Sequence, residues 1–331
     1  MDIVGILRQR ARRAQRAIVL PEADDERILK ATKIIVDEQL ARIILLSAPE
    51  AVVQKAGQIG LDLNKITLIN PLQSPERSRF AQEFYELRKH KGVTPEEAGT
   101  QMANYVNFAA MMVRNNLADG FVAGAATTTA DVAKAAIYGI GFGERITTIS
   151  SCFLVTVPDC AYGANGTFVF ADCGIIPDPS PSQLANIAAS ASELFRLLVE
   201  EEPLVALLSF STKGSASHEM VDKIVRAREI IEKKYPELTV DGELQLDAAI
   251  VPEVARIKAP ESKVAGAANV LIFPDLNAGN IAYKLVQRLA KAEVIGPMMN
   301  GLKKPCSDLS RGCTVDEVVN AVCTTAIRVT K

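Results

Sequence analysis

Three side chains that could do chemistry lie close together near the end of the chain: the hydroxyl of Ser310, the guanidinium of Arg311 and the carboxylate of Glu317. Thr314, followed three residues later by Glu317, has the spacing of a helix N-cap with a capping box. A helix N-terminus attracts anions, and arginine binds phosphate oxygens through two parallel hydrogen bonds. Residues 301–319 therefore predict a phosphate-binding site with a candidate general base, although a self-capped surface turn explains the same pattern.

A second candidate phosphate site is the hydroxyl-rich run 127–131, which contains Thr128 and Thr129. It follows an expected strand at 121–125 and opens an expected helix. Ligands of parallel α/β sheets bind at such strand ends. Three hydroxyls and free backbone N–H groups suit a phosphate, and ordinary N-capping is the alternative.

The elements that must position these residues alternate along the first part of the chain. Apolar runs at 17–20, 41–46 and 66–69 are typical of strands, and helical spacing occurs at 24–38 and 49–59. Repeated strand–helix units predict a parallel sheet covered by helices. Further helices are expected at 74–91 and, as one or two elements, at 94–116.

The pattern changes after residue 146. Two runs rich in β-branched and aromatic residues, 147–157 and 166–171, predict strands joined by a turn at 163–166. A helix is expected from residue 182, after the Pro/Ser-rich break at 177–181. We expect further strands at 205–210, 248–251 and 270–273, and domain boundaries near 143–145 and 296–297.

Composition limits the function classes. The chain has 331 residues, 48% hydrophobic and 23% charged, with a net charge of −2, which suits two globular domains and gives no basic excess for nucleic acid. No apolar stretch is long enough for a transmembrane helix, and the N-terminus does not resemble a secretory signal. Six cysteines without a CxxC motif and only two histidines predict reduced thiols in the cytoplasm and no metal site.

The segment K-P-C-S-D-L-S-R-G-C at 304–313 resembles the signature of the phosphate acetyltransferases, also called phosphotransacetylases. Other blocks of that family occur in the same order across nearly the whole chain: 84–92, 128–132, 209–215, 241–245 and 273–284. The resemblance implies two three-layer α/β/α domains with largely parallel sheets and an active-site cleft between them. The first domain would comprise 1–144 plus 296–331, and the second 145–295. A homodimer is also implied.

The resemblance assigns roles to several residues. Arg311 would bind the phosphoryl group and stabilise the transition state, and Ser310 would hydrogen-bond the thiol or the oxyanion. The family's base is usually an Asp six residues after the Arg. Here that position is Glu317, with Asp316 beside it, so the base is one or the other.

Coenzyme A contacts follow in the same way. Arg88 corresponds to an arginine that contacts the 3′-phosphate of coenzyme A, although its basic strip alone suggests a solvated face. Lys134 replaces a second arginine, which keeps the charge and loses the bidentate geometry. Cys160 aligns with a cysteine near the family's active site. Asn280 and Tyr283 are expected to line a pocket, and Lys213 is a candidate anion contact.

The sequence thus predicts reversible transfer of an acetyl group between coenzyme A and inorganic phosphate, by direct thiolate attack in a ternary complex. Coenzyme A is a substrate, and no covalently bound cofactor is expected. Three alternatives stay open: a butyryl or other short-chain acyltransferase, a non-catalytic regulator that binds coenzyme A or acyl phosphate, and a metal-dependent dehydrogenase of similar shape. For the last we find no convincing metal or nucleotide site.

Overall fold

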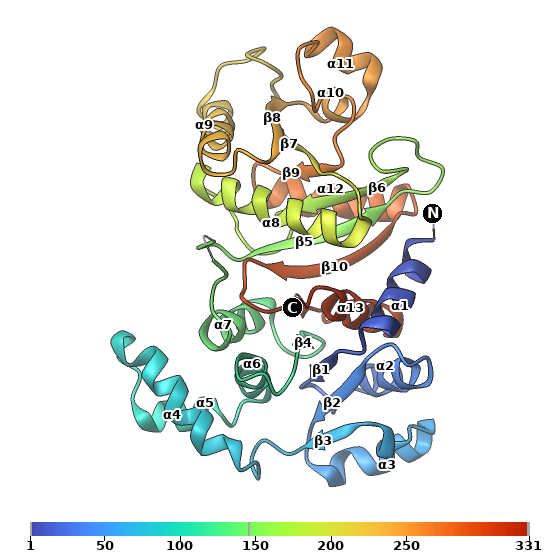
Figure 1. Ribbon diagram of the computed structural model, residues 1–331, viewed down its shortest axis with the longest axis vertical. Coiled ribbons are helices and arrows are strands. Elements are labelled where there is room, and N and C mark those ends of the chain that lie inside the picture. Colours follow the sequence, from blue (N-terminus) through green and yellow to red (C-terminus); the bar gives the residue numbers. More distant parts are fainter. Residues whose placement is uncertain (1, 145, 330–331) are drawn as a thin grey trace. The chain divides into compact units, whose positions relative to one another are not determined.

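The structure is a computed structural model that describes residues 2–144 and 146–329 (Figure 1). It contains two compact units. The N-terminal unit combines Asp2–Glu144 with the chain from Leu302 onward, and the central unit is the chain between them, up to Gly301. None of the described helices is both long and apolar enough to cross a membrane.

The N-terminal unit is built on five parallel strands in the order β3-β2-β1-β4-β11. Their bounds are β1 (Ala17–Leu20), β2 (Arg42–Leu46), β3 (Thr67–Ile69), β4 (Gly120–Ala123) and β11 (Cys306–Asp308). In register, Val19 lies opposite Ile44 and Phe121, and Val122 lies opposite Ser307. All ends that follow these strands therefore meet at one edge of the sheet.

Helices cover both faces of this sheet. Ile18 and Leu20 belong to one apolar core, which includes residues of α1 (Ile3–Ala14), α2 (Glu26–Asp37), α3 (Pro49–Ile59) and α13 (Val315–Ile327).

The other face of the sheet is also covered. Val19, which lies between Ile18 and Leu20 on β1, points to this face and is fully buried. On that side lie α4 (Glu76–Arg88), α6 (Tyr105–Arg114) and α7 (Thr129–Gly139), of which α6 contacts β4 and α7 contacts β11. Burial on both faces explains the nearly continuous apolar strands. The short α5 (Pro95–Gln101) precedes α6.

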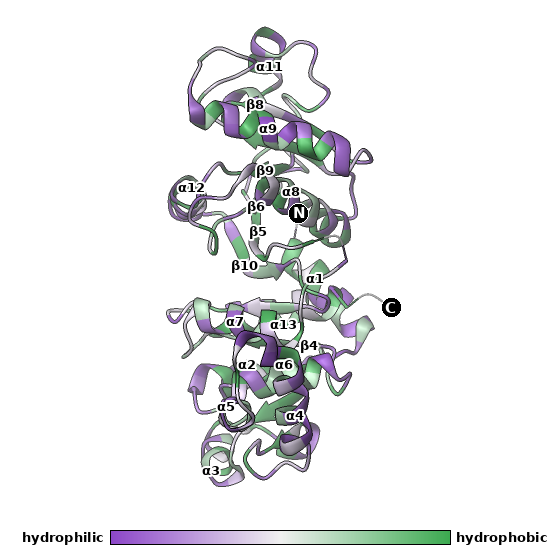
Figure 2. Ribbon diagram, turned by 90° about the vertical axis from the view of Figure 1, so that its left-hand side faces the viewer, coloured by the Kyte–Doolittle hydropathy of each residue, from purple (hydrophilic) through white to green (hydrophobic). Residues whose placement is uncertain are grey.

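The central unit has a mixed sheet in the order β10-β5-β6-β9-β7-β8. The strands β10 (Glu293–Asn300), β5 (Ser150–Thr156) and β6 (Thr167–Ala171) pair antiparallel, and β6, β9 (Val270–Ile272), β7 (Leu204–Leu208) and β8 (Thr239–Leu244) pair parallel. Its helices are α8 (Pro181–Val199), α9 (Glu219–Lys234), α10 (Leu246–Ile250), α11 (Pro252–Lys258) and α12 (Leu276–Leu289). Figure 2 shows the alternating hydrophobic and hydrophilic bands of α9, whose buried residues include Val221 and Ile224.

The turn expected at 163–166 is confirmed. Ala164 and Thr167 exchange two backbone hydrogen bonds of 3.1 and 3.0 Å. Between them, Asn165 and Gly166 have φ angles of 50° and 85°. Two consecutive positive φ values are what a two-residue hairpin turn requires, and Asn-Gly adopts them at least cost.

The strand expected at 248–251 is wrong, because these residues belong to α10 and its C-cap. A short run of small apolar residues fits either a strand or a helix, and alanine favours the helix.

Three strands were not expected: β8, β10 and β11. The predicted boundary at 296–297 lies inside β10, whose pairing with β5 shifts register between Ile295 and Met298. Gly and Pro there mark an irregular strand.

Candidate active site

The loop that carries Ser310 and Arg311 connects β11 to α13 and is anchored on both sides. Leu309 before it and Cys313 after it are buried in the apolar core, at 3% and 5% exposure. The predicted capping box is confirmed: Glu317 N donates to Thr314 Oγ1 at 3.2 Å, and Thr314 N donates to Glu317 Oε2 at 2.8 Å. These anchors hold a short exposed loop in one conformation.

Arg311 presents its charge outward. The residue is exposed, and within residues 2–144 and 146–329 its guanidinium has no carboxylate or other acceptor. The Ser310 hydroxyl oxygen accepts from Gly312 N at 3.2 Å, which leaves its proton able to donate. An unpaired guanidinium beside a hydroxyl donor is suited to an anion with several oxygens, such as a phosphate.

Arg27, at the start of α2, holds this loop by hydrogen bonds to its backbone. Its Nη1 donates to the carbonyls of Arg311 and Cys313 at 2.8 and 2.9 Å. Its Nη2 donates to the carbonyl of Ala125 at 3.0 Å and to Asp25 at 2.6 Å. These bonds with Arg27 lower the pKa of the Asp25 carboxyl. One side chain thus links the loops that follow β1, β4 and β11.

Glu22, which follows β1, fills a nest of backbone N–H groups. Its Oε2 accepts from Gly124 and Ala125, each at 2.8 Å, and its Oε1 accepts from Ala126 and Thr127 at 3.0 and 2.7 Å. Four consecutive N–H groups around one carboxylate form an anion site of the kind that binds phosphates. Here the chain supplies its own anion.

The expectation of free N–H groups at 127–131 is therefore wrong at two positions. Thr127 N donates to Glu22, and Asp131 N donates to the Thr128 hydroxyl at 3.2 Å. Thr128 is the N-cap of α7. The signal missed was Glu22, a carboxylate distant in sequence, which no local pattern connects to residues 124–127.

Thr129 connects α7 to the end of β11. Its hydroxyl donates to Asp308 Oδ2 at 2.6 Å. Asp308 is 1% exposed, and its Oδ1 has no hydrogen-bond partner in the described chain. Burial raises the pKa of this carboxyl to about 7. Gly124 makes the close approach possible, because a Cβ at this residue, with φ of +120°, would lie 2.4 Å from Asp308 Oδ1.

The two candidate bases differ in their surroundings. Asp316 is highly exposed, and its Oδ1 lies 3.3 Å from Arg8 Nη2 on α1. Glu317 is half-buried, with Oε2 in the capping box. Its other oxygen, Oε1, has no hydrogen-bond partner among the described residues.

Arg88 and Lys134 come together in the N-terminal unit, although they are distant in sequence. The Arg88 Cζ lies 3.7 Å from the centroid of the Tyr138 ring, and the Lys134 Nζ lies 5.8 Å from the same centroid. Arg88 ends α4, whereas Lys134 and Tyr138 lie on α7. The structure thus gathers two predicted coenzyme A contacts around an aromatic residue that the sequence analysis did not single out.

The remaining predicted residues lie in the central unit and have local partners. Lys213 forms an ion pair with Asp241. Asn280 Nδ2 donates to the carbonyl of Cys173 at 3.1 Å. The Tyr283 ring stacks on Phe153, with centroids 4.3 Å apart.

Cys160 lies apart from Asn280 within this unit. It precedes β6, whereas Cys173, which Asn280 contacts, follows the same strand. Cys160 lines a cavity of about 630 Å³ with residues that include Thr156, Lys291 and Glu293. Among the described residues, no cluster of three or more His, Cys, Asp or Glu side chains could hold a metal ion.

Comparison with known proteins identifies the family. The profile of the phosphate acetyl/butaryl transferases matches residues 2–326. The chain belongs to this family. It is 47% identical over 328 residues to the phosphate acetyltransferase of Thermoanaerobacterium thermosaccharolyticum, covering 99% of each chain. The phosphate acetyltransferase of Clostridium acetobutylicum is 44% identical and aligns over 99% of this chain and 98% of its own.

Solved structures agree with this result. The chain resembles a phosphotransacetylase from Streptococcus pyogenes with a TM-score of 0.93 and 39% identity, covering 99% of this chain and 98% of that one. A 4-hydroxythreonine-4-phosphate dehydrogenase from Klebsiella pneumoniae shares the fold alone, at a TM-score of 0.52 and 10% identity over 95% of this chain and 97% of that one. Family membership confirms the resemblance at 304–313 and the α/β fold class.

Proposed function

We infer that this chain is a phosphate acetyltransferase, which interconverts acetyl-CoA plus phosphate with acetyl phosphate plus coenzyme A. The observation that carries the inference is the anchored loop that presents the Ser310 hydroxyl and the Arg311 guanidinium, which has no acceptor among the residues that the structure describes. Full-length relatives named phosphate acetyltransferase support the acetyl substrate.

The chemistry requires a thiolate, since a thiol is a poor nucleophile. A carboxylate takes the thiol proton of coenzyme A, and the sulfur attacks the carbonyl carbon of acetyl phosphate. The carbonyl becomes a tetrahedral oxyanion. Its collapse breaks the bond between carbonyl carbon and phosphate oxygen, so that acetyl-CoA and phosphate leave.

Arg311 has the charge and the exposure to bind the phosphoryl group and to stabilise the negative charge that develops on it. Ser310 can donate a hydrogen bond to the sulfur or to the oxyanion. Rigid anchoring of the loop by Arg27 and the capping box keeps both groups in place before substrate binds. Preorganised donors of this kind stabilise a transition state more than mobile ones do.

We assign the base to Glu317 and not to Asp316. The Asp316 carboxylate lies 3.3 Å from Arg8 Nη2 and is directed toward α1. Glu317 keeps one oxygen without a partner in the described chain, and it lies in the first turn of the helix that follows Arg311. Glu317→Gln should then slow the chemical step and alter its pH profile while Asp316→Asn does little; the reverse pattern would reassign the base.

For coenzyme A, Arg88 and Lys134 are the proposed phosphate contacts. The bonds of Thr128 and Thr129 favour supporting roles for these residues in the loop after β4. Contacts of Cys160, Lys213, Asn280 and Tyr283 with substrate remain proposals from the family resemblance.

A homodimer is also proposed. Ile281, Leu285 and Leu289 follow one another at intervals of four residues on α12 and are 57%, 51% and 80% exposed. This spacing places them on one helix face. An exposed apolar stripe is typical of an interface, and a second copy of the chain would cover it. Sedimentation of the purified protein as a monomer at assay concentration would exclude the dimer.

The activity is tested by phosphate-dependent release of coenzyme A from acetyl-, propionyl- and butyryl-CoA, with and without EDTA. We expect turnover that EDTA does not inhibit and that is fastest with the acetyl substrate. A folded protein that binds coenzyme A without any turnover would instead be a regulator.

A further inference from the structure

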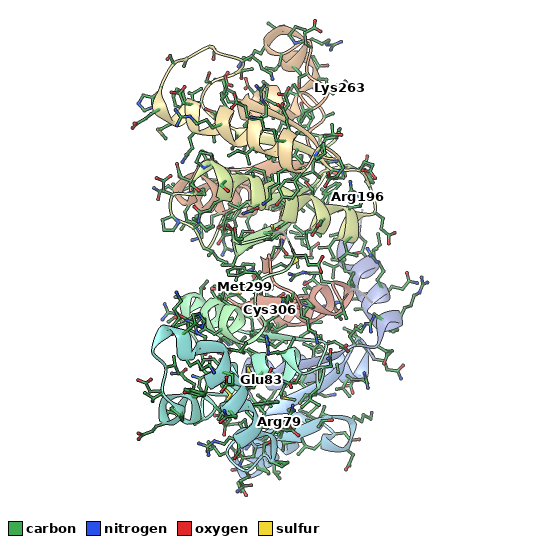
Figure 3. The ribbon with its side chains drawn as sticks, turned by 60° about the vertical axis from the view of Figure 1, so that its left-hand side comes forward. Arg79, Glu83, Arg196, Lys263, Met299 and Cys306 are labelled. Atoms are coloured by element: carbon green, nitrogen blue, oxygen red, sulfur yellow. The ribbon has the colours of Figure 1, made fainter. Side chains whose placement is uncertain are left out.

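Most charged residues of α4 are paired with one another, with α6 and its C-cap, or with the residue that follows α4. Arg79 contacts Glu76 and Asn115, Glu83 binds Arg114 at 2.6 Å, and Lys89 pairs with Glu86. Figure 3 labels Arg79 and Glu83 in this region. Arg88 differs, since no acidic side chain in the described chain pairs with it and its buried Nε has no hydrogen-bond partner.

The contact that Arg88 does make is with the Tyr138 ring. The distance of 3.7 Å from Cζ to the ring centroid places the guanidinium directly against the aromatic face. Phe84, which is buried, lies against the same tyrosine with ring centroids 6.5 Å apart. Lys134, one helical turn before Tyr138 on α7, brings a second cation to within 5.8 Å of that ring.

An aromatic face holds a cation without neutralising it. Two positive groups near one ring would repel each other, and the negative face of the ring offsets part of this repulsion. A carboxylate partner would instead neutralise the positive charge of the cation. The arrangement therefore fixes two cations in place while both stay available to an anion, which lowers the entropy lost when the anion binds.

We propose that Tyr138 is a positioning residue that sets the affinity for a phosphate group of coenzyme A by holding Arg88 and Lys134 around its ring. The inference rests on the proposed function, because it takes coenzyme A as the ligand. Coenzyme A has a 3′-phosphate and a pyrophosphate, and the experiment separates them.

The test is to measure, by calorimetry, the binding of coenzyme A and of 3′-dephospho-coenzyme A to wild type, Tyr138→Leu and Tyr138→Phe. The KM of each protein for each of the two ligands is measured as well. Tyr138→Leu should weaken coenzyme A binding about three- to tenfold, as expected for a lost cation–π contact. Tyr138→Phe should bind as wild type does, because it keeps the ring. If the 3′-phosphate is the ligand, dephospho-coenzyme A binding should change little.

Phe80→Leu is the matched control. Phe80 is a buried aromatic residue on α4 with its own arginine, Arg79, at 5.0 Å, and its ring packs on Phe108 of α6. Its loss therefore disturbs a different aromatic contact of the same helix. An equal loss for both ligands in Tyr138→Leu, absent from Phe80→Leu, would support the role and assign the pyrophosphate. Unchanged affinities in Tyr138→Leu, or losses that Phe80→Leu reproduces, would overturn it. Because binding is measured without turnover, failure of the proposed activity would appear separately.

Discussion

Glu22 occupies, with its own carboxylate, a nest that would otherwise suit a substrate phosphate. The four N–H groups of residues 124–127 converge on it, so the loop after β4 is held by an internal anion. Because Glu22 already occupies the nest, Arg311 is our proposed phosphate contact. It also fixes α7, which carries Thr129, Lys134 and Tyr138.

Glu22→Gln tests this role. The amide offers one acceptor oxygen, and its NH₂ group faces donors, so two backbone N–H groups lose their acceptor. We expect the free energy of unfolding to fall by about 2–4 kcal/mol and kcat to fall about tenfold as the loop loosens. Urea denaturation and steady-state kinetics measure both. Asp24→Asn removes the same charge from an exposed neighbour in the same loop, and equal effects in the two variants would contradict the proposal.

Asp308 makes stability depend on pH. Burial raises its pKa from 3.8 to about 7, so between these values the folded protein keeps a proton that the unfolded chain releases. The free energy of unfolding therefore falls as pH rises through this window, and this contribution is lost above it. The full shift corresponds to roughly 4 kcal/mol.

Asp308→Asn should flatten this dependence, because the amide does not titrate. Urea denaturation at about pH 5 and about pH 8 should show a smaller loss of stability with rising pH in the variant than in wild type. Parallel pH profiles for the two proteins would show that Asp308 does not titrate in this range.

The sequence pattern brought together the candidate catalytic residues, which are neighbours in the chain, but it did not reveal the residues that hold their loop. Ser310, Arg311 and the capping box at Thr314 lie within one short segment, so their relation is visible in the pattern. Arg27 and Glu22 act across loops that only the folded sheet brings together. Tyr138 was missed for the same reason, since its partner Arg88 comes from another helix.

At the scale of elements, repeated strand–helix spacing predicted the parallel sheet of the N-terminal unit. The missed strands β8, β10 and β11 contain Gly242, Gly296–Pro297 and the polar end Ser307–Asp308. Their pairing in the sheet overrides these low strand propensities. The run 248–251 was expected to be a strand and is helical instead, because nothing in its composition distinguishes a short helix from a buried strand.

The β5–β6 hairpin gives a test of turn chemistry. Gly166 has a φ of +85°, and a Cβ there would lie 2.4 Å from the carbonyl oxygen of Val157. Gly166→Ala should lower the free energy of unfolding by about 1–3 kcal/mol through backbone strain. Gly99→Ala is the control: this helical glycine has no atom within 4 Å of its Cβ position, so urea denaturation should show no loss. Equal stability of Gly166→Ala and wild type would mean that the turn relaxes.

At the scale of the whole molecule, the proposed acetyltransferase chemistry depends on a few exposed groups held by a large buried framework. The family match extends over residues 2–326 and so includes this framework as well as the motif at 304–313. The acyl preference depends on the dimensions of a pocket, which a sequence motif does not encode. In the proposed reaction, Arg311 makes the charge contact that stabilises the transition state.

The most direct measurement is kcat/KM for acetyl phosphate formation by Arg311→Ala and wild type. We expect a fall of about 100- to 1,000-fold, as for the loss of a transition-state charge contact. Unfolding should stay unchanged, because the Arg311 side chain is exposed and has no acceptor in the described chain. Arg13→Ala, which removes an exposed arginine on α1, should keep wild-type activity. Near-wild-type kcat/KM in Arg311→Ala would contradict the assignment of the site.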